Sequence, residues 1–168
     1  MTEAEQDRAF SDTIARFGGA IARMARGDEA DADLRRDLEQ DIQVALWQSL
    51  ARFDARYALS TWVWRVAHII ARRRHSGQHW ANIEDIDLAT DDPTPFERVT
   101  SEQAMALILS IIDRLDPPDR QILLLYLEGV AAAEAGEITG VSPEGVATNI
   151  HRFKTMLTRC FALTGDAS

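Results

Sequence analysis

The residues between Tyr57 and Ile83 carry the side chains that are best suited to binding nucleic acid. The stretch contains no acidic residue, and its basic residues are Arg65, Arg72, Arg73 and Arg74. Three aromatic residues stand at or near its start, namely Tyr57, Trp62 and Trp64. Positive side chains follow phosphates and aromatic rings stack on unpaired bases. This combination is therefore typical of proteins that bind single-stranded nucleic acid.

Helical spacing divides this stretch into an apolar and a polar face. In a helix running from a cap at Ser60 or Thr61 to about His75, the residues that can face a core are Val63, Val66, Ala67 and Ile70. The remaining side forms one polar stripe of Arg65, His68, Arg72 and His75. We expect Trp62 to lie in the core. Trp64, next to Arg65, has two interpretations, a core residue or an exposed ring that binds a base.

A second nucleic-acid motif is predicted between Val130 and Phe161. A short helix over residues 130–138 meets the turn Thr139-Gly140-Val141, which contains the glycine that a helix-turn-helix favours. Ser142 then caps a second helix, with Pro143 at its first position and Glu144 in its first turn. The residues that this helix should bury are Val146, Ile150, Phe153, Leu157 and Phe161. A plain helical hairpin with a glycine turn is the alternative interpretation.

The opposite face of that second helix carries the residues that could read DNA. In a helix-turn-helix, the N-terminal part of the second helix contacts base edges in the major groove. Thr148 and Asn149 are small polar side chains suited to that contact, while Arg152 and Lys154 suit phosphates. The same face also carries Ala147, His151 and Thr155.

The sequence shows no pattern that is typical of catalysis or of metal binding. It has no paired carboxylates placed for acid–base chemistry, no nucleophile next to a base and no phosphate-binding loop, so we expect neither enzyme activity nor a cofactor. His75 and His79 are four residues apart, but Gly77 lies between them, and Cys160 belongs to the other half of the chain. We therefore expect no metal site.

The apolar pattern is helical almost throughout and predicts an all-α protein. Thr2 and Glu5 form a capping box ahead of a first helix that should end at Gly27. Later helices should bury residues that include Leu34, Leu38 and Met105. Residues 78–94 are acidic and rich in turn-forming residues, which predicts a linker. The architecture is therefore two small helical domains, residues 1–77 and 95–168, joined by an acidic linker, with the helix-turn-helix in the C-terminal domain.

Charge and composition narrow the classes of function. The 168-residue chain has a formal net charge of −9, which by itself argues against binding DNA. The acidic residues are concentrated in residues 28–41 and 84–97, however, apart from the basic segments. No apolar run approaches the roughly 20 residues that cross a bilayer, and the acidic N-terminus does not match a secretory signal. With its single cysteine, the chain is expected to be cytoplasmic, without membrane insertion.

Together these motifs resemble the sigma-70 family of transcription initiation factors, specifically its small extracytoplasmic-function (ECF) group. Asp37-Leu38-Glu39-Gln40-Asp41-Ile42 through Leu46-Trp47 is similar to the family's polymerase-docking segment. Phe53-Asp54-x-Arg56 and Thr61-Trp62-x-x-Arg65-Val66-Ala67 resemble the helix that reads and opens the minus-ten element. Leu115-Asp116-Pro117-Pro118 through Gly129 resembles the start of the second domain, and Gly140-Val141-Ser142 with His151-Arg152 its helix-turn-helix. The four motifs follow the family's order and cover nearly the whole chain.

The resemblance implies a sigma factor that directs RNA polymerase to promoters and catalyses nothing itself. The implied partners are core RNA polymerase, promoter DNA and an anti-sigma factor. The implied polymerase-binding residues, expected on one face outside the core, are Asp37, Leu38, Gln40 and Asp41. The residues implied at the minus-ten element are Tyr57, Trp64, Arg65, His68, Arg72, Arg73 and Arg74. Those implied at the minus-thirty-five element are Ser142, Glu144, Ala147, Thr148, Asn149, His151, Arg152 and Lys154.

Several residues depart from the family pattern. His68 stands where the family usually has Asn, and Ala147 and Asn149 stand where it has basic residues. Gly136, in the first helix of the helix-turn-helix, costs about 1 kcal/mol of helix stability relative to alanine. These departures leave open a second interpretation, a sigma-like decoy or interaction protein that binds polymerase or an anti-sigma factor without promoter recognition. A stand-alone repressor would leave the docking segment and the basic helix unexplained.

Overall fold

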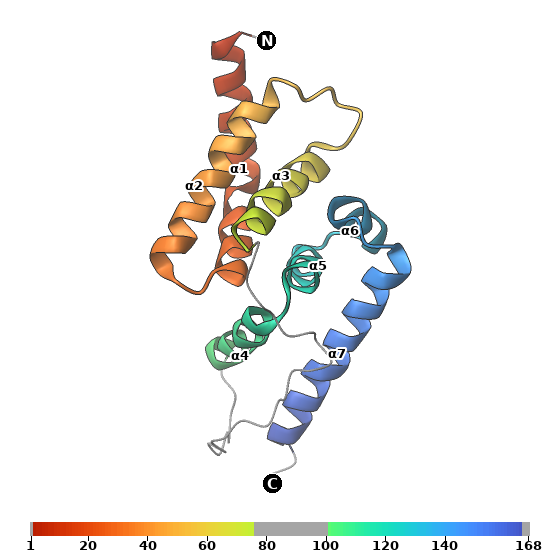
Figure 1. Ribbon diagram of the computed structural model, residues 1–168. Helices are drawn as coiled ribbons and strands as arrows, with labels where there is room; N and C mark the ends of the chain where they lie inside the picture. The colour runs from red at the N-terminus through yellow and green to blue at the C-terminus, as the bar shows by residue number, and fades with distance from the viewer. Residues whose placement is uncertain (1, 76–100, 166–168) are drawn as a thin grey trace.

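The computed structural model describes residues 2–75 and 101–165, and within these ranges the chain forms seven α-helices and no strand (Figure 1). The first group is α1 (Glu3–Asp28), α2 (Ala32–Leu50) and α3 (Leu59–Arg74). The second group is α4 (Ser101–Arg114), α5 (Pro117–Leu127), α6 (Ala132–Thr139) and α7 (Pro143–Gly165). The predicted all-α fold with two helical domains is confirmed. The predicted linker, residues 78–94, and both domain boundaries lie outside the described residues.

Helix α1 begins at the predicted capping box. The Thr2 N–H donates to Glu5 Oε2 (2.7 Å), and the Glu5 N–H donates to Thr2 Oγ1 (3.3 Å). The hydrogen bond from the Thr2 backbone N–H favours the ionised carboxylate and, together with the Thr2 side chain, lowers the pKa of Glu5. Phe17, Ile21 and Met24, which follow at helical spacing, are all buried. The capped helix therefore presents one apolar face to the core.

Gly27 has a different role from the helix stop that the sequence predicts. Helix α1 continues past it to Asp28. A Cβ atom at Gly27 would overlap the Leu124 side chain of α5. The missing side chain lets α1 and α5 approach closely at a point where the two groups of helices meet.

The start of α3 also differs from the sequence-based expectation. The helix begins at Leu59, and its N-cap residue Ala58 makes no side-chain hydrogen bond. Thr61, one of the two predicted caps, is buried and donates from Oγ1 to Glu134 Oε1 of α6 (2.6 Å). The Thr61 hydroxyl, which was expected to cap the start of the helix, therefore connects the two groups of helices.

Helices α6 and α7 form the predicted helix-turn-helix. Gly140 ends α6 with a φ of 78°, a left-handed conformation that glycine adopts without strain. The Ser142 hydroxyl accepts a hydrogen bond from the Gly145 N–H (3.1 Å), which confirms the predicted cap. Inside α6, a Cβ atom at Gly136 would lie 2.8 Å from the Val141 carbonyl oxygen. The turn therefore closes tightly because residue 136 has no side chain.

The core of the second group follows the predicted pattern on α7, whereas α4 departs from it at Met105. Val146, Ile150 and Phe153 are buried, and the half-buried Leu157 packs against them, whereas Phe161 lies outside the described side chains. Met105, predicted to be buried, is 51% exposed. Burial on α4 is concentrated in its last turn, which is the part that faces the rest of the fold.

The two groups of helices share one core. Buried side chains of α1, α3, α5 and α6 belong to a single apolar cluster, and Figure 1 shows α3 and the C-terminal end of α1 facing α5 and α6. No helix within residues 2–75 and 101–165 combines the length and the apolar character needed to cross a membrane.

We expect Gly136→Ala to lower the free energy of unfolding by about 1–3 kcal/mol, because the added Cβ would force the Val141 carbonyl to move. Gly19→Ala is the matched control. A Cβ at Gly19 meets the Arg23 side chain at an ordinary 3.5 Å, so this variant should be more stable by up to about 1 kcal/mol. Chemical denaturation followed by circular dichroism measures both effects. If Gly136→Ala instead raises the free energy of unfolding, the close approach of the Val141 carbonyl to residue 136 is contradicted.

Candidate nucleic-acid interface

Helix α3 presents basic side chains in its last turn and near its middle. Arg72 and Arg73, in the last turn, are exposed. Near the middle, Arg65 is half-buried: its guanidinium lies over the Tyr57 ring, 4.9 Å from the centroid, and donates to the Glu137 carbonyl oxygen of α6 (3.3 Å). Tyr57 is itself 47% exposed. A ligand approaching from solvent would therefore meet an aromatic ring before the start of α3 and cations further along it.

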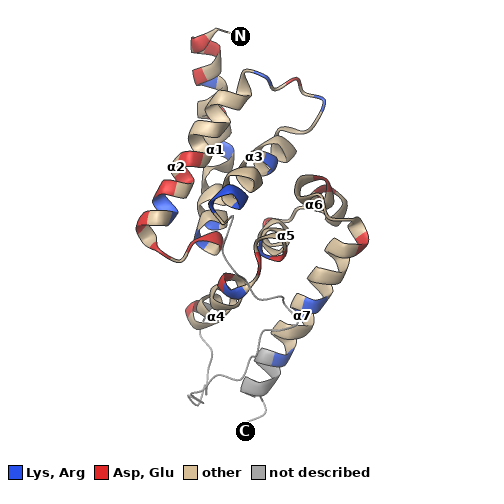
Figure 2. Ribbon diagram, in the orientation of Figure 1, with Lys and Arg blue, Asp and Glu red and all other residues tan. Residues whose placement is uncertain are grey.

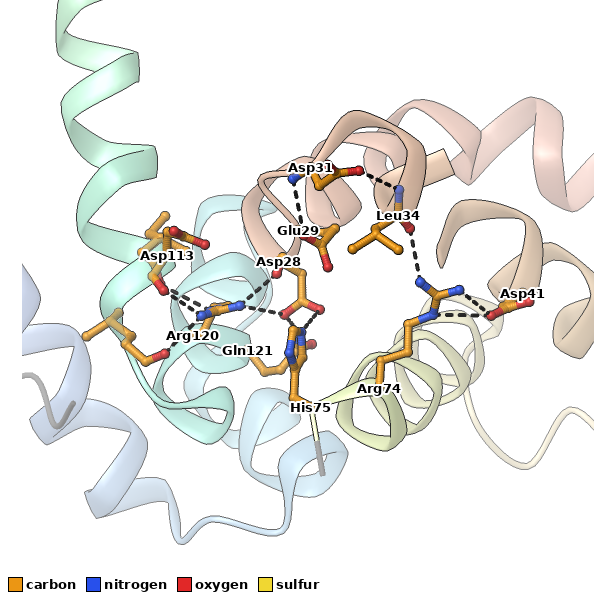
Figure 3. Close-up of polar contacts among 12 residues, drawn as sticks. Asp28, Glu29, Asp31, Leu34, Asp41, Arg74, His75, Asp113, Arg120 and Gln121 are labelled. Carbon is orange, nitrogen blue, oxygen red and sulfur yellow. Dashed lines mark hydrogen bonds and ion pairs between the residues drawn. The ribbon is translucent and has the colours of Figure 1, made fainter. Parts of the chain in front are cut away.

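Arg74 is held against α2. Its Nη2 lies 2.9 Å from Asp41 Oδ2, and its Nη1 donates to the Leu34 carbonyl oxygen (3.0 Å). Figure 3 shows these contacts beside the buried cluster described below. Arg74 therefore joins α3 to α2 and is not the freely exposed side chain that the sequence suggests.

Trp64 is a core residue, which corrects its assignment to the nucleic-acid surface. Its side chain is 4% exposed and meets Phe17 of α1 edge to face, with ring centroids 6.2 Å apart. Residues at spacings of three or four share a helix face, and Trp64 therefore lies above the buried Ala67 and Ala71. Trp62, expected in the core, is half-buried, with its indole N–H donating to Ser49 Oγ (3.0 Å).

His68 is also buried, at 5% exposure, and faces the second group of helices. Burial lowers its pKa and the neighbouring Arg72 lowers it further, while Gln121 and Asp28 have the opposite effect. His75, from the same predicted stripe, is 8% exposed. The prediction that the polar stripe of α3 faces solvent is therefore wrong at His68 and His75, because α5 and α6 pack against that side of the helix.

The exposed side of α2 carries three of the four predicted docking residues. Asp37, Gln40 and Asp41 are exposed. Leu38 does not share their face, since it is 1% exposed. Successive residues of a helix lie about 100° apart, which puts Leu38 in the buried row of α2 while its neighbours point outward. Val44, at 49% exposure, supplies an apolar residue on the outer side that the sequence pattern did not indicate.

The outer surface of α2 is therefore acidic with apolar residues between the acids. Figure 2 shows acidic residues gathered along α2, and basic residues on α3 and on the middle of α7. Leu34, predicted to lie in the core, is 49% exposed near the start of α2. Such a surface is complementary to a partner helix that carries basic and apolar side chains.

The N-terminal half of α7 presents the predicted reading face to solvent. The exposed residues at this end are Ser142, Glu144, Ala147, Thr148, His151, Arg152 and Lys154. They lie opposite the buried row of Val146, Ile150 and Phe153. The helix therefore has one face in the core and the other open to a large partner.

Asn149 is the exception on this helix. It is half-buried, and its side-chain amide donates to Asp119 Oδ1 of α5 (2.7 Å). Lys154 has its ammonium 5.1 Å from the centroid of the Tyr126 ring, also on α5. Asn149, predicted to read bases, holds α7 against α5 in this structure, and Thr148 remains the exposed small polar side chain of that turn.

A buried polar cluster around Asp28, which the sequence analysis missed, connects the two groups of helices (Figure 3). The Asp28 carboxylate is 1% exposed; its Oδ2 lies 2.8 Å from His75 Nε2, and its Oδ1 accepts from Gln121 Nε2 (2.9 Å). Arg120, fully buried on α5, donates from Nη1 to the Asp28 carbonyl oxygen (2.7 Å). Carboxylate, imidazole, amide and guanidinium therefore meet at the junction of α1, α3 and α5.

Arg120 also supports the end of α4. Its Nε donates to the Ile112 carbonyl oxygen (3.1 Å), and its Nη2 donates to those of Asp113 (2.7 Å) and Leu115 (3.1 Å). Burial lowers the pKa of Arg120, and Asp28 is the main group that opposes this effect. One signal in the sequence could have identified this residue. Arg120 comes just before the apolar run of α5, and a charged side chain on a buried helix has no route to solvent.

Among the described residues, no group of three His, Cys, Asp or Glu side chains could hold a metal ion. Within the described part of the chain, three surfaces carry exposed side chains suited to a partner: the outer side of α2, the basic residues of α3 and the exposed face of α7.

Known proteins share both the sequence pattern and the fold of this chain. Residues 105–157 match the family model described as Sigma-70, region 4. The chain is 30% identical over 161 residues to the RNA polymerase sigma factor NccH of Alcaligenes xylosoxydans xylosoxydans, across 89% of this chain and 85% of NccH. It is also 30% identical over 165 residues to the RNA polymerase sigma factor CnrH of Cupriavidus metallidurans, with the same coverage.

A solved structure of CnrH in complex with the cytosolic domain of CnrY has the same fold, with a TM-score of 0.68 and 23% identity, over 98% of this chain and 96% of that one. From the sequence matches, the chain belongs to the sigma-70 family of RNA polymerase sigma factors, in its extracytoplasmic-function group. The family resemblance of the motifs is thereby confirmed.

We expect Arg120→Met to lower the free energy of unfolding by about 3–5 kcal/mol, because it leaves the Asp28 carboxylate and several carbonyl oxygens without a buried cation. Arg114→Met is the control, since Arg114 is an exposed side chain at the end of α4, and its loss should change stability by less than about 1 kcal/mol. Urea denaturation compares the two. Equal, small losses would show that the buried cluster adds no stability.

Proposed function

We propose that this sigma factor directs core RNA polymerase to specific promoters by reading a minus-ten and a minus-thirty-five element. The observation that carries the proposal is the division of the N-terminal half of α7 into a buried face and an open one. Thr148, His151 and Arg152 lie on the open face at the end that a recognition helix inserts into the major groove. Thr148 is suited to base edges and Arg152 to phosphate.

At the minus-ten element, we assign the contacts with the opened strand to Tyr57, Arg65, Arg72 and Arg73. The Tyr57 ring offers a stacking surface, and the arginines offer positive charge near the middle and in the last turn of α3. Trp64 and His68 are left out of this assignment because both are buried.

For polymerase docking, we assign the outer side of α2. Asp37, Gln40 and Asp41 provide acidic and polar groups, and Val44 provides an exposed apolar one. This combination supports binding to a helical surface of polymerase that carries basic and apolar side chains. Polymerase then performs the nucleotidyl transfer, and the factor supplies specificity without catalysing a reaction.

An anti-sigma factor is the third partner that we propose. The solved structure of CnrH contains the cytosolic domain of CnrY, so a protein of this fold and family forms a complex with a second chain. The exposed apolar residues of this chain, Leu34, Val44 and Ile69, provide surface for such a complex on α2 and α3.

A decoy that binds polymerase without reading promoters is the second candidate function. Three observations favour it. Residue 147 is an alanine where the family usually has a basic side chain, and Asn149 already donates to Asp119. The formal net charge of −9 also weakens contact with DNA. Transcription in vitro, with purified core polymerase and promoters from the source genome, separates the two candidates. Promoter-specific transcripts support the sigma factor, and polymerase binding without transcripts supports the decoy.

We expect Asp37→Arg to weaken binding to core polymerase by about tenfold, because it places a positive charge on the acidic side of α2. Asp37 is preferred to Asp41, whose change would also remove the ion pair with Arg74. Asp12→Arg, on the exposed side of α1, is the control with the same change of charge. A pull-down with purified polymerase measures both. If the two variants bind polymerase equally well, the assignment of α2 as the docking surface is wrong.

In the full initiation complex, we expect Arg152→Ala to weaken initiation at all upstream sequences alike, because a phosphate contact carries no base information. Thr148→Ala should instead change preference at particular base pairs, with about 1–3 kcal/mol of discrimination lost for a good contact. Transcription from a library of upstream elements distinguishes these effects. If activity ignores the upstream sequence and survives both substitutions, α7 does not read DNA.

A further inference from the structure

The polar side chains of α7 divide into two sets, one directed toward α5 and one left on the outer side. The side-chain amide of Asn149 donates to Asp119 Oδ1 (2.7 Å), and the ammonium of Lys154 lies 5.1 Å from the centroid of the Tyr126 ring. Asp119 and Tyr126 both belong to α5. The amide and the ammonium are hydrogen-bond donors, so packing against α5 directs two donors away from the outer side of α7.

The outer side keeps hydrogen-bond acceptors in the first turns of α7. Glu144 and Thr148 are both exposed and four residues apart, so they lie one above the other on the helix. The Thr148 hydroxyl donates its hydrogen to the Glu144 carbonyl oxygen (2.8 Å). A hydroxyl has one hydrogen and two lone pairs, so Thr148 Oγ1 can still accept a hydrogen bond but has no second hydrogen to give. A carboxylate likewise accepts without donating. We call Glu144 and Thr148 the acceptor pair.

The donors that most often read guanine are absent from this end of the helix. Arginine and lysine bind the guanine edge, and residues 143–149 contain neither. Arg152 is exposed but lies about two turns beyond Glu144. In a recognition helix the N-terminal residues meet the base edges, which leaves a phosphate contact to Arg152.

Base pairs differ in what they offer to an acceptor in the major groove. Adenine N6 and cytosine N4 are amino groups that donate hydrogen bonds, whereas the guanine edge carries only the acceptors N7 and O6. The Thr148 side chain also has a methyl group, which suits the 5-methyl group of the thymine paired with that adenine. An A·T pair therefore fits Thr148, and a cytosine edge fits the Glu144 carboxylate.

We propose that the acceptor pair makes this factor select base edges that carry amino groups, with adenine at Thr148 and cytosine at Glu144. The inference rests on the role of α7 in the proposed function, and it names the chemical groups that α7 recognises. Asn149 is then a positioning residue. Its hydrogen bond to Asp119 fixes α7 against α5 and so directs the acceptor pair outward.

A set of threonine variants tests the hydroxyl as an acceptor. Transcription by core polymerase with the full chain, from a library of randomised upstream elements, measures the preference at each base pair. Thr148→Val removes the hydroxyl and keeps the branched shape, so we expect the preference for adenine at one position to fall about tenfold. Thr148→Ser keeps the hydroxyl and should retain most of that preference. Thr158→Val is the control, because the Thr158 hydroxyl makes the same kind of hydrogen bond, to the Lys154 carbonyl oxygen (2.9 Å), far from the helix start.

The Glu144 carboxylate is tested in the same library. Glu144→Gln keeps the shape of the side chain but replaces one acceptor oxygen with an amide that donates. The preference for cytosine at a neighbouring position should therefore fall about fivefold. Total transcription summed over the library should change little, which shows that the variant is folded and docked on polymerase.

Modified bases identify the group that is read. In the most active upstream element, purine in place of the selected adenine lacks the N6 amino group. It should lower transcription about tenfold with the unmodified factor and have little effect with Thr148→Val, because the two changes remove the same contact. The matched control is 7-deazaadenine, which lacks N7, keeps the amino group and should leave transcription unchanged.

The outcomes separate this inference from the proposed function. If initiation depends on the upstream sequence, but the position that responds to Thr148→Val selects guanine or no position responds, the acceptor pair is overturned and the proposed function stands. Equal losses with purine and 7-deazaadenine also overturn it. If initiation by the unmodified factor ignores the upstream sequence, both the acceptor pair and the reading role of α7 are overturned.

Discussion

The carboxylate of Asp28 is the constraint on which the packing of the two helical groups depends. A carboxyl group at 1% exposure requires buried partners, and Asp28 obtains them from different parts of the chain: His75 at the end of α3, and Gln121 and Arg120 on α5. Arg120 in turn satisfies carbonyl oxygens at the end of α4. One cluster of four side chains therefore sets the position of α5 against α1 and α3, and with it what covers the basic helix.

Features within a single helix could be predicted from the sequence, because a helix repeats every 3.6 residues and local hydrogen bonds decide its ends. The capping box at Thr2 and the cap at Ser142 are of this kind. So is the buried row that starts at Val146. Leu38 shows where the same rule was misapplied: its acidic neighbours suggested a common outer face, although one residue along a helix is a rotation of about 100°.

Contacts between distant helices could not be predicted in this way. Periodicity classifies a face as polar or apolar, but it does not say which element, far away in the sequence, will cover it. His68 and Trp64 of α3 are buried because α3 packs on α1 at one side and on α5 and α6 at another. Gly27 has the local appearance of a helix stop, and its role becomes visible only through Leu124, almost a hundred residues away.

The separation of charge between α2 and the two basic helices bears on how the factor finds its partners among a large excess of genomic DNA. Proteins collect on arbitrary DNA when their cations displace condensed counterions, whatever the base sequence. A chain with a formal charge of −9 gains little from that exchange, and its acidic helix is repelled by the phosphates. Under the function proposed above, chromosomal DNA is therefore a poor competitor with polymerase for the free factor.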